Sequence, residues 1–171
     1  STGESGTKRE IVHSPDGKTW TKAKSRPDAC GGYYRGAASG GGVTVLASGT
    51  GDVCYSKDGG ETWGIVKLAD ELSSSVVWTG TEFMVWSGST RFRASDGATW
   101  QKDVASPASV SIGPVARAAD GTLVAANAGW MVWYEKQKFY RSTDGKTWEV
   151  AASFTGSHPI NFIAAGYVEP G

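Results

Sequence analysis

Ser142-Thr-Asp-Gly-Lys-Thr-Trp148 is one of four similar stretches in this chain of 171 residues. The other three are Ser14-Pro-Asp-Gly-Lys-Thr-Trp20, Ser56-Lys-Asp-Gly-Gly-Glu-Thr-Trp63 and Ala94-Ser-Asp-Gly-Ala-Thr-Trp100. Their aspartates, Asp16, Asp58, Asp96 and Asp144, are 42, 38 and 48 residues apart. A repeat of about 40 to 50 residues is typical of one four-stranded blade of a β-propeller. The spacing therefore predicts an all-β chain built of successive antiparallel blades.

Each copy of the stretch has the composition of a tight turn. Asp-Gly between two alternating apolar runs favours a hairpin, because glycine adopts positive φ and the carboxylate accepts hydrogen bonds from the backbone N–H groups that follow it. The serine and threonine hydroxyls are placed to bond other polar groups of the turn, and the tryptophan is expected to fold back as an apolar plug. We therefore expect each copy to pin one hairpin.

These residues resemble the Asp-box, also called the BNR repeat, whose consensus is Ser-x-Asp-x-Gly-x-Thr-Trp. The resemblance implies a β-propeller in which each box lies on the rim, between the third and fourth strands of a blade. In the third copy Ala94 replaces the serine, so we expect that box to be the least well fastened. The residues assigned to the structural boxes are Ser14, Asp16, Gly17, Thr19 and Trp20; Ser56, Asp58, Gly59, Thr62 and Trp63; Asp96, Gly97, Thr99 and Trp100; and Ser142, Asp144, Gly145, Thr147 and Trp148.

The apolar runs between the boxes predict three complete blades over residues 33–152. A half blade is expected before them at residues 9–23, and one further inner strand after them at residues 160–168. Residues 1–8 are expected to be a flexible polar linker, which leaves 9–171 as the propeller domain. Either the terminal strands close a small ring, or the chain is about half of a larger ring completed by a second chain, which is a homodimer partner or another polypeptide. We favour the second arrangement, because an open arc exposes apolar faces and strand edges.

Composition narrows the classes of partner. Lys and Arg total 17 and Asp and Glu total 17, so the formal net charge is zero and the basic stripe required for nucleic-acid binding is missing. No apolar run reaches the roughly 18 residues that span a bilayer, so no membrane contact is expected. Cys30 and Cys54 are not accompanied by further zinc-ligand spacing. A disulfide between them is favoured over two free thiols, and it indicates a secreted or periplasmic protein.

The face opposite the boxes is expected to carry the ligand site. There the connection from Asn127 to Lys138 is longer than the corresponding turns at residues 48–52 and 87–91. Because aromatic rings stack on sugars and a carboxylate binds hydroxyl groups, this connection predicts a secreted binding module with carbohydrate as the favoured ligand class. The alternative is an extended hairpin whose tryptophans pack on a neighbouring blade or chain. The candidate ligand-binding residues are Trp130, Trp133, Tyr134, Glu135 and Arg91.

An extracellular glycoside hydrolase, with a site on the same face or shared between chains, is the alternative function. Asp70 and Glu71 are its candidate catalytic pair, because many glycosidases use two carboxylates held at a set distance. Proteins with the Asp-box include sialidases, but no Arg-Ile-Pro motif places a sialidase arginine in this chain. No Gly-x-Ser-x-Gly elbow is present either. We therefore expect a binding module rather than an enzyme, with no cofactor and no metal. The third functional class is a structural propeller that only binds a partner protein.

Overall fold

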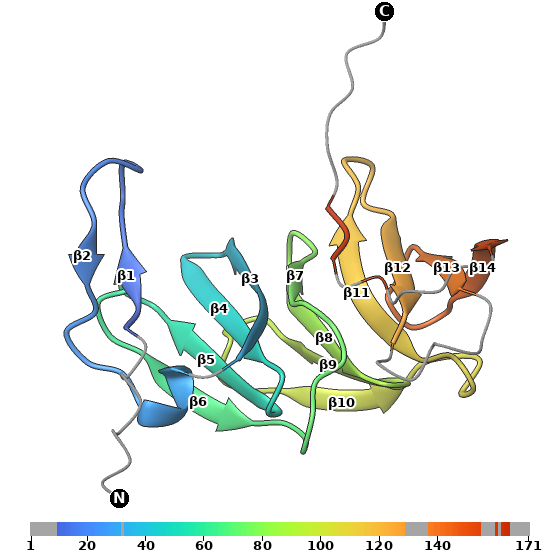
Figure 1. Cartoon of the computed structure of the whole chain (residues 1–171), viewed down its shortest axis with the longest axis horizontal. Helices are drawn as coiled ribbons and strands as arrows, with labels where there is room; N and C mark the ends of the chain where they lie inside the picture. The colour runs from blue at the N-terminus through green and yellow to red at the C-terminus, as the bar shows by residue number, and fades with distance from the viewer. Residues whose placement is uncertain (1–9, 32, 129–136, 155–159, 161, 165–171) are drawn as a thin grey trace, which may run out of the picture.

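The computed structural model describes residues 10–31, 33–128, 137–154, 160 and 162–164 (Figure 1). In these parts of the chain the strands form one two-stranded sheet and three four-stranded sheets. Neighbouring strands are antiparallel, and each four-stranded sheet is a meander in which consecutive strands pair. The all-β fold of four-stranded antiparallel blades that the sequence predicts is therefore confirmed.

The sheets follow the order of the chain. The two-stranded sheet contains β1 (Val12–His13) and β2 (Thr21–Lys22), and a short 3-10 helix, η1 (Asp28–Gly31), comes next. The first blade contains β3 (Tyr34–Gly40), β4 (Val43–Ser48), β5 (Asp52–Ser56) and β6 (Gly64–Lys67). The second contains β7 (Val77–Trp78), β8 (Phe83–Ser87), β9 (Thr90–Ala94) and β10 (Gln101–Val104). The third contains β11 (Ile112–Arg117), β12 (Leu123–Asn127), β13 (Gln137–Ser142) and β14 (Glu149–Phe154).

The first strand of each blade is its inner strand, because β3 lies against β7 and β7 lies against β11. The three blades begin and end close to the predicted limits of residues 33 and 152, and the inner strand β7 has only two residues. Residues just before it use their side chains to join blades: the Ser73 hydroxyl donates to the carbonyl of Ile112 at 2.6 Å, and that of Ser75 to the carbonyl of Val115 at 2.9 Å. At the predicted last strand, Ile160 and residues 162–164 carry no strand, and the rest of that strand lies outside the described residues.

Apolar side chains fill the spaces between successive blades. Val45, Val53 and Val85 belong to the core between the first and second blades and are fully buried. Trp86 and Ile112 are fully buried in the core between the second and third blades. Buried residues alternate with more exposed ones along most of β4, whereas residues 83–86 of β8 are all buried, because the second blade packs against a neighbouring blade on each face.

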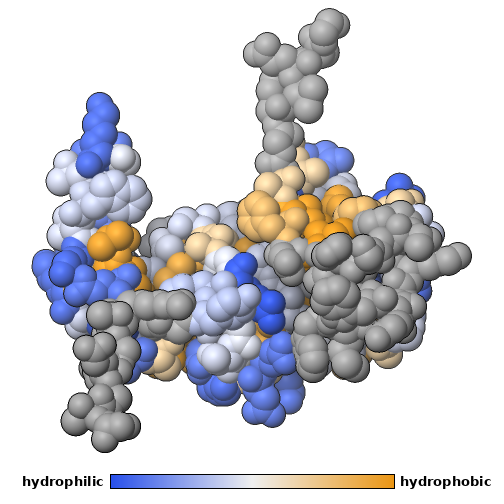
Figure 2. Space-filling model, viewed as in Figure 1, coloured by the Kyte–Doolittle hydropathy of each residue, from blue (hydrophilic) through white to orange (hydrophobic). Residues whose placement is uncertain are grey.

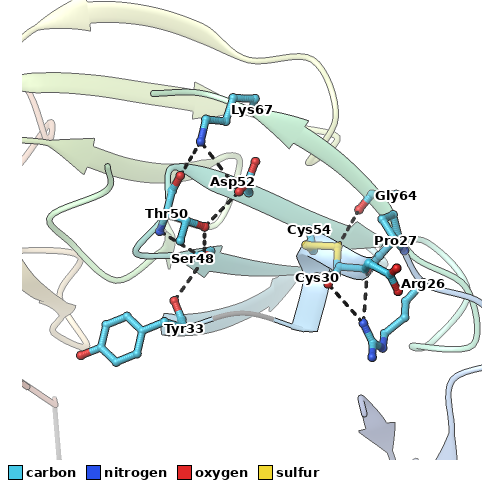
Figure 3. The surroundings of a disulfide bond; sticks show 11 residues. Arg26, Pro27, Cys30, Tyr33, Ser48, Thr50, Asp52, Cys54, Gly64 and Lys67 are labelled. Atoms are coloured by element: carbon cyan, nitrogen blue, oxygen red, sulfur yellow. Dashed lines mark hydrogen bonds and ion pairs between the residues drawn. A yellow bond between two sulfur atoms is a disulfide. The ribbon is translucent and has the colours of Figure 1, made fainter. Parts of the chain in front are cut away.

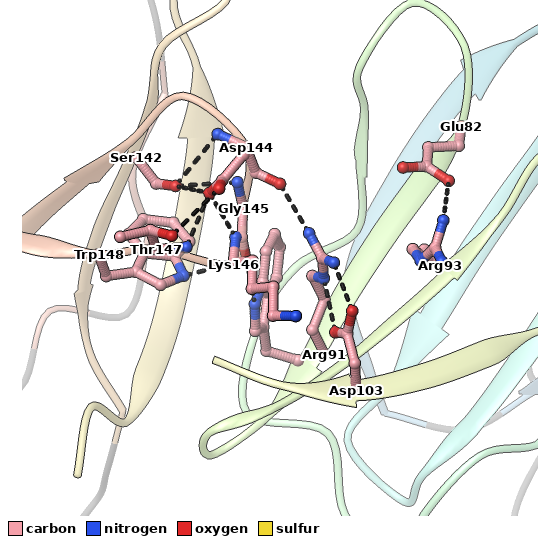
Figure 4. A network of polar contacts seen from close by, with 11 residues as sticks. Glu82, Arg91, Arg93, Asp103, Ser142, Asp144, Gly145, Lys146, Thr147 and Trp148 are labelled. Carbon is pink, nitrogen blue, oxygen red and sulfur yellow. Dashed lines mark hydrogen bonds and ion pairs between the residues drawn. The ribbon is translucent and has the colours of Figure 1, made fainter. Parts of the chain in front are cut away.

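The fourth box shows how hydrogen bonds within the repeated stretch stabilise its turn. In the fourth box the Asp144 carboxylate accepts the backbone N–H groups of Lys146 and Thr147 at 2.8 and 2.7 Å. The Ser142 hydroxyl donates to Asp144 at 3.0 Å and accepts the N–H of Gly145 at 2.8 Å (Figure 4). Gly145 has a φ of 69°, a conformation that favours glycine. The box lies between the third and fourth strands of its blade, as the resemblance implies.

The third and first boxes each lack a different part of this arrangement. In the third box Asp96 still accepts the N–H groups of Ala98 and Thr99, but Ala94 supplies no hydroxyl. In the first box Ser14 and Asp16 are bonded at 2.9 Å, whereas Trp20 is 62% exposed. The third box therefore lacks the serine hydrogen bonds of the fourth box, as predicted from Ala94. The first box differs in another way, because its tryptophan is not packed against the protein.

The later boxes dock on the blade that precedes them in the chain. A Cβ placed on Gly97 would lie 3.0 Å from side-chain carbons of Val43 and Val45, and one on Gly145 would lie 2.6 Å from the sulfur of Met84. Gly97 and Gly145 therefore mark close contacts between a box and the preceding second strand. A Cβ placed on Gly17 would meet nothing within 4 Å in the described structure.

The described blades form an open array. The β1–β2 sheet and the β11–β14 sheet lie at opposite ends of the long axis of the molecule (Figure 1). The sheets that the structure describes thus do not meet end to end, while most of the predicted strand at residues 160–168, through which a small ring would close, lies outside the described residues.

Candidate functional site

The predicted aromatic platform lies outside the described residues. Trp130, Trp133, Tyr134 and Glu135 belong to the connection between β12 and β13, of which only the base is described. At this base the side-chain carbonyl of Asn127 accepts the backbone N–H of Lys138 at 2.9 Å.

Arg91, one of the predicted ligand-binding residues, is nearly buried and binds other residues of the protein. Its side chain is only 8% exposed and forms two hydrogen bonds with the Asp103 carboxylate, at 2.8 and 2.6 Å. The remaining terminal nitrogen donates to the backbone carbonyl of Asp144 at 2.6 Å (Figure 4). A planar guanidinium fits such a bidentate arrangement. Arg91 thus joins the second blade to the box of the third.

The predicted catalytic candidates Asp70 and Glu71 lie in the connection between β6 and β7, and both are exposed. Glu71 forms an ion pair with Arg35, with 3.3 Å between the carboxylate oxygen and the guanidinium nitrogen. The guanidinium carbon of Arg35 in turn lies 5.4 Å from the ring centroid of Tyr33, whose side chain is 61% exposed. We call Tyr33, Arg35 and Glu71 the loop-face cluster. It presents an aromatic ring, hydrogen-bond donors and a carboxylate side by side.

The turn between β4 and β5 holds the backbone of this cluster (Figure 3). The carbonyl of Tyr33 accepts hydrogen bonds from the Ser48 hydroxyl at 3.1 Å and from the N–H of Gly49 at 2.7 Å. Thr50 continues the network by donating its hydroxyl to Asp52 at 2.9 Å. The start of the first inner strand is therefore fastened to the neighbouring turn.

A disulfide fastens the other side of the same region. Cys30, in η1, is bonded to Cys54, in β5, with 5.8 Å between their Cα atoms (Figure 3). Both cysteines are fully buried and pack with Trp63 of the second box. The disulfide favoured by the sequence is present, and it links the segment ahead of the inner strand to the third strand of the same blade.

Hydrogen bonds of the fold account for the aspartates with lowered pKa values. Backbone N–H groups, led by that of Thr19, lower the pKa of Asp16 to about 2. The Thr62 hydroxyl and N–H lower the pKa of Asp58 to about 2. The hydrogen bond from Arg91 lowers the pKa of Asp103. These carboxyl groups serve turns and an ion pair between strands. The residues that the structure describes contain no group of three or more potential metal ligands and no helix able to cross a membrane.

Sequence reasoning did not single out the exposed first box. Trp20 and Gly17 occupy the same positions in the repeat as Trp148 and Gly145, so the repeat itself carries no signal that distinguishes them. Only the packing shows that the fourth box is covered and the first is not. Tyr33 could be recognised from its place in a blade connection, but its stacking with Arg35 depends on the fold.

No protein-family model and no curated protein sequence matches this chain. Several solved structures have a similar fold. YCF48 bound to D1 peptide aligns with a TM-score of 0.62 and 18% identity, over 93% of this chain and 52% of that one. Virginiamycin B lyase from Staphylococcus aureus aligns with a TM-score of 0.62 and 12% identity, over 91% and 54%. YCF48 from Cyanidioschyzon merolae aligns with a TM-score of 0.59 and 17% identity, over 94% and 53%.

These similarities establish the β-propeller fold. The chain spans about half the length of the propellers it matches.

Proposed function

We propose that this chain is a β-propeller interaction module whose ring is completed by a second copy of the chain. The exposed first box carries the proposal. Its turn has the same aspartate hydrogen bonds as the other boxes, yet Trp20 is 62% exposed and the space beside Gly17 is open among the described residues. At the third and fourth boxes, the second strand of the preceding blade occupies this position.

Apolar surface at both ends of the array supports association. Val12, in β1, is 48% exposed, and β1 pairs only with β2 among the described strands. Figure 2 shows apolar residues beside the β1–β2 sheet and over β11 at the other end. Exposed apolar patches and unpaired strand edges are typical of surfaces that bind another chain. The similarity to propellers of about twice this length agrees with a shared ring.

Light scattering at several protein concentrations tests this association. We expect the wild-type chain to have twice the chain mass of 17.9 kDa at high concentration, and Trp20→Ser to shift it toward the monomer. Val104→Ser is the matched control, because Val104 is 52% exposed on β10, away from both ends of the array. A wild-type protein that stays at the single-chain mass at every concentration would contradict the proposal, as would equal effects of the two substitutions.

Carbohydrate is the ligand class that we propose for the loop face. The exposed ring of Tyr33 offers a stacking surface, and Arg35 and Glu71 offer hydrogen-bond partners next to it. Sugars combine an apolar C–H face with hydroxyl edges, so this combination suits them. A glycan array with the wild type, Tyr33→Ala, and Trp130→Ala with Trp133→Ala tests the assignment. Loss of binding in the variants supports it, and an array on which the wild type binds no glycan overturns it.

Substitution of a candidate catalytic carboxylate distinguishes the alternative function, a glycoside hydrolase, from a binding module. Asp70→Asn would retain glycan binding and abolish turnover if Asp70 were catalytic. A propeller that only binds a protein partner would show neither effect. A secreted or periplasmic location is part of our proposal, and the buried disulfide supports it, since such bonds persist in oxidising compartments.

A further inference from the structure

A groove of about 380 Å³ lies between the second and third blades, on the side of the boxes. Its walls come from the turn between β7 and β8, the turn between β11 and β12, and the beginning of the fourth box. Met84 and Leu123, which are almost fully buried, contribute apolar lining. The volume is in the usual range for small-molecule sites, about 300 to 1,000 Å³. This groove is on the opposite side from the loop-face cluster.

The preceding pair of blades shows how such a space is closed. Trp78 pairs with Phe83 in the second blade, and Arg117 pairs with Leu123 at the corresponding position of the third. Trp78 packs onto the turn of the first blade so closely that a Cβ on Gly40 would lie 2.2 Å from its ring. Arg117 instead lies at the groove and is exposed. The chain thus fills the first inter-blade space with tryptophan and leaves the second open.

Hydroxyl groups and compensated charges dominate the walls of the groove. Four threonines contribute to the lining: Thr79, Thr81, Thr122 and Thr143. The Glu82 carboxylate faces Arg93 at 3.5 Å (Figure 4). Asp120 accepts the backbone N–H of Thr122 at 2.9 Å, which is the main cause that lowers its pKa, and the positive charge of Arg117 adds to the effect. Asp144 is satisfied by the hydrogen bonds of its own box. Each carboxylate therefore has protein partners already, and a charged ligand gains little from the lining.

We propose that this groove binds one neutral sugar residue. The methyl groups of the lining threonines suit the C–H face of a pyranose, while the threonine hydroxyls, Arg117 and the carboxylates suit its hydroxyl edge. The inference extends the carbohydrate part of the proposed function to a second site, which does not use the loop-face cluster. A basic peptide is the competing occupant, because three carboxylates line the groove.

Amide chemical shifts of the 15N-labelled protein test the site. The probes are glucose, galactose, mannose, xylose and N-acetylglucosamine, each titrated separately, with a lysine-containing tripeptide as the cationic probe. We expect at least one sugar to produce saturable shifts at Gly121, Thr122 and Thr143, and the peptide to produce none there. No saturable shift with any of the five sugars overturns the proposal, and so does binding of the peptide alone.

Substitutions link the shifts to the groove. Arg117→Trp copies Trp78 and should close the space, so sugar binding there should be lost. If this variant does not fold, Thr81→Val and Thr143→Val each remove a hydroxyl while keeping the side-chain shape, and each should weaken binding about fivefold. Thr21→Val, on exposed β2, is the control and should bind like the wild type. Unchanged binding in Arg117→Trp and both threonine variants contradicts the site.

The proposed sugar site at the loop-face cluster is tested independently of the groove. Its test is the loss of glycan binding in Tyr33→Ala or in Trp130→Ala with Trp133→Ala, and these changes should leave the shifts at Gly121 and Thr122 intact.

Discussion

The indole nitrogen of Trp86 donates a hydrogen bond to the carbonyl oxygen of Gly145, 3.2 Å away, and so joins the second blade to the box of the third. The same indole meets the ring of Trp148 edge-on, with 5.6 Å between the ring centroids. Arg91 adds a third link by donating to the carbonyl of Asp144. The boxes thus fasten two successive blades to each other as well as the two strands of one hairpin.

Trp86→Phe tests this link between blades. The change removes the hydrogen bond to Gly145 and leaves a gap in a fully buried position, so we expect a loss of about 2 to 3 kcal/mol in the free energy of unfolding. Urea denaturation measures it. The control Val104→Ala, at an exposed position, should change stability by less than about 0.5 kcal/mol. Equal effects of the two substitutions would mean that Trp86 contributes no special contact.

Ala94→Ser supplies the hydroxyl that the third box lacks. In the fourth box the serine hydroxyl bonds both the aspartate and the glycine N–H, at 3.0 and 2.8 Å. We expect Ala94→Ser to stabilise the protein by about 1 kcal/mol and Ser142→Ala to destabilise it by at least as much. Thermal unfolding followed by circular dichroism measures both. A destabilised Ala94→Ser variant would show that the third box cannot accommodate the hydroxyl in this geometry.

The lowered pKa values of the box aspartates predict a dependence of stability on pH. Because the folded pKa of Asp58 is about 2, against 3.8 for the free side chain, its contribution is present above about pH 3.8 and is lost as pH falls toward 2. Thr62→Val removes the largest cause of this shift, so the pKa of Asp58 should rise and its part of the acid destabilisation should shrink. NMR titration of the carboxyl carbon and unfolding at several pH values measure the two effects.

Thr21→Val is the control for this titration, because Thr21 lies on β2 outside the boxes. A pKa of Asp58 that stays near 2 in Thr62→Val would assign the shift to other hydrogen bonds of the turn.

The ion pair of Arg91 and Asp103 should behave as a coupled unit. Asp103→Ala leaves the Arg91 side chain, which is 8% exposed, without its carboxylate partner, and we expect a loss of about 2 to 3 kcal/mol. Adding Arg91→Met should cost much less than its effect in the wild type, because the unpaired charge is removed. Urea denaturation of the two single variants and the double variant gives the coupling energy. Additive effects would show that the two residues are independent.

The disulfide should stabilise the first blade by restricting the unfolded chain. Cys30 and Cys54 are 24 residues apart, so replacing both by serine should cost about 2 to 4 kcal/mol. Unfolding with and without dithiothreitol measures this: the reductant should destabilise the wild type by a similar amount and leave the double variant unchanged. A wild type indifferent to the reductant would contradict the prediction.

Some residues of the candidate sites could be located from the sequence, whereas their contacts depend on the packing of the blades. Glu71 and Tyr33 could be placed in blade connections from the repeat, but their common partner Arg35 was not predicted. The sequence places Arg91 at the end of a turn. That Asp103 lies opposite Arg91 on the neighbouring strand and binds it was not predicted. The groove beside Arg117 lies on the side of the boxes, where no residue pattern predicts a ligand site.

The all-β fold, the place of each box and the order of the blades could all be read from the residues. These follow from local chemistry, because an Asp-Gly turn with its own hydroxyl and carboxylate partners closes a hairpin from residues adjacent in the chain. The packing of the blades makes the difference between Trp148, which is buried, and Trp20, which is 62% exposed in an almost identical stretch. Burial depends on which blade lies against the box, and that neighbour comes from a distant part of the chain or from another molecule.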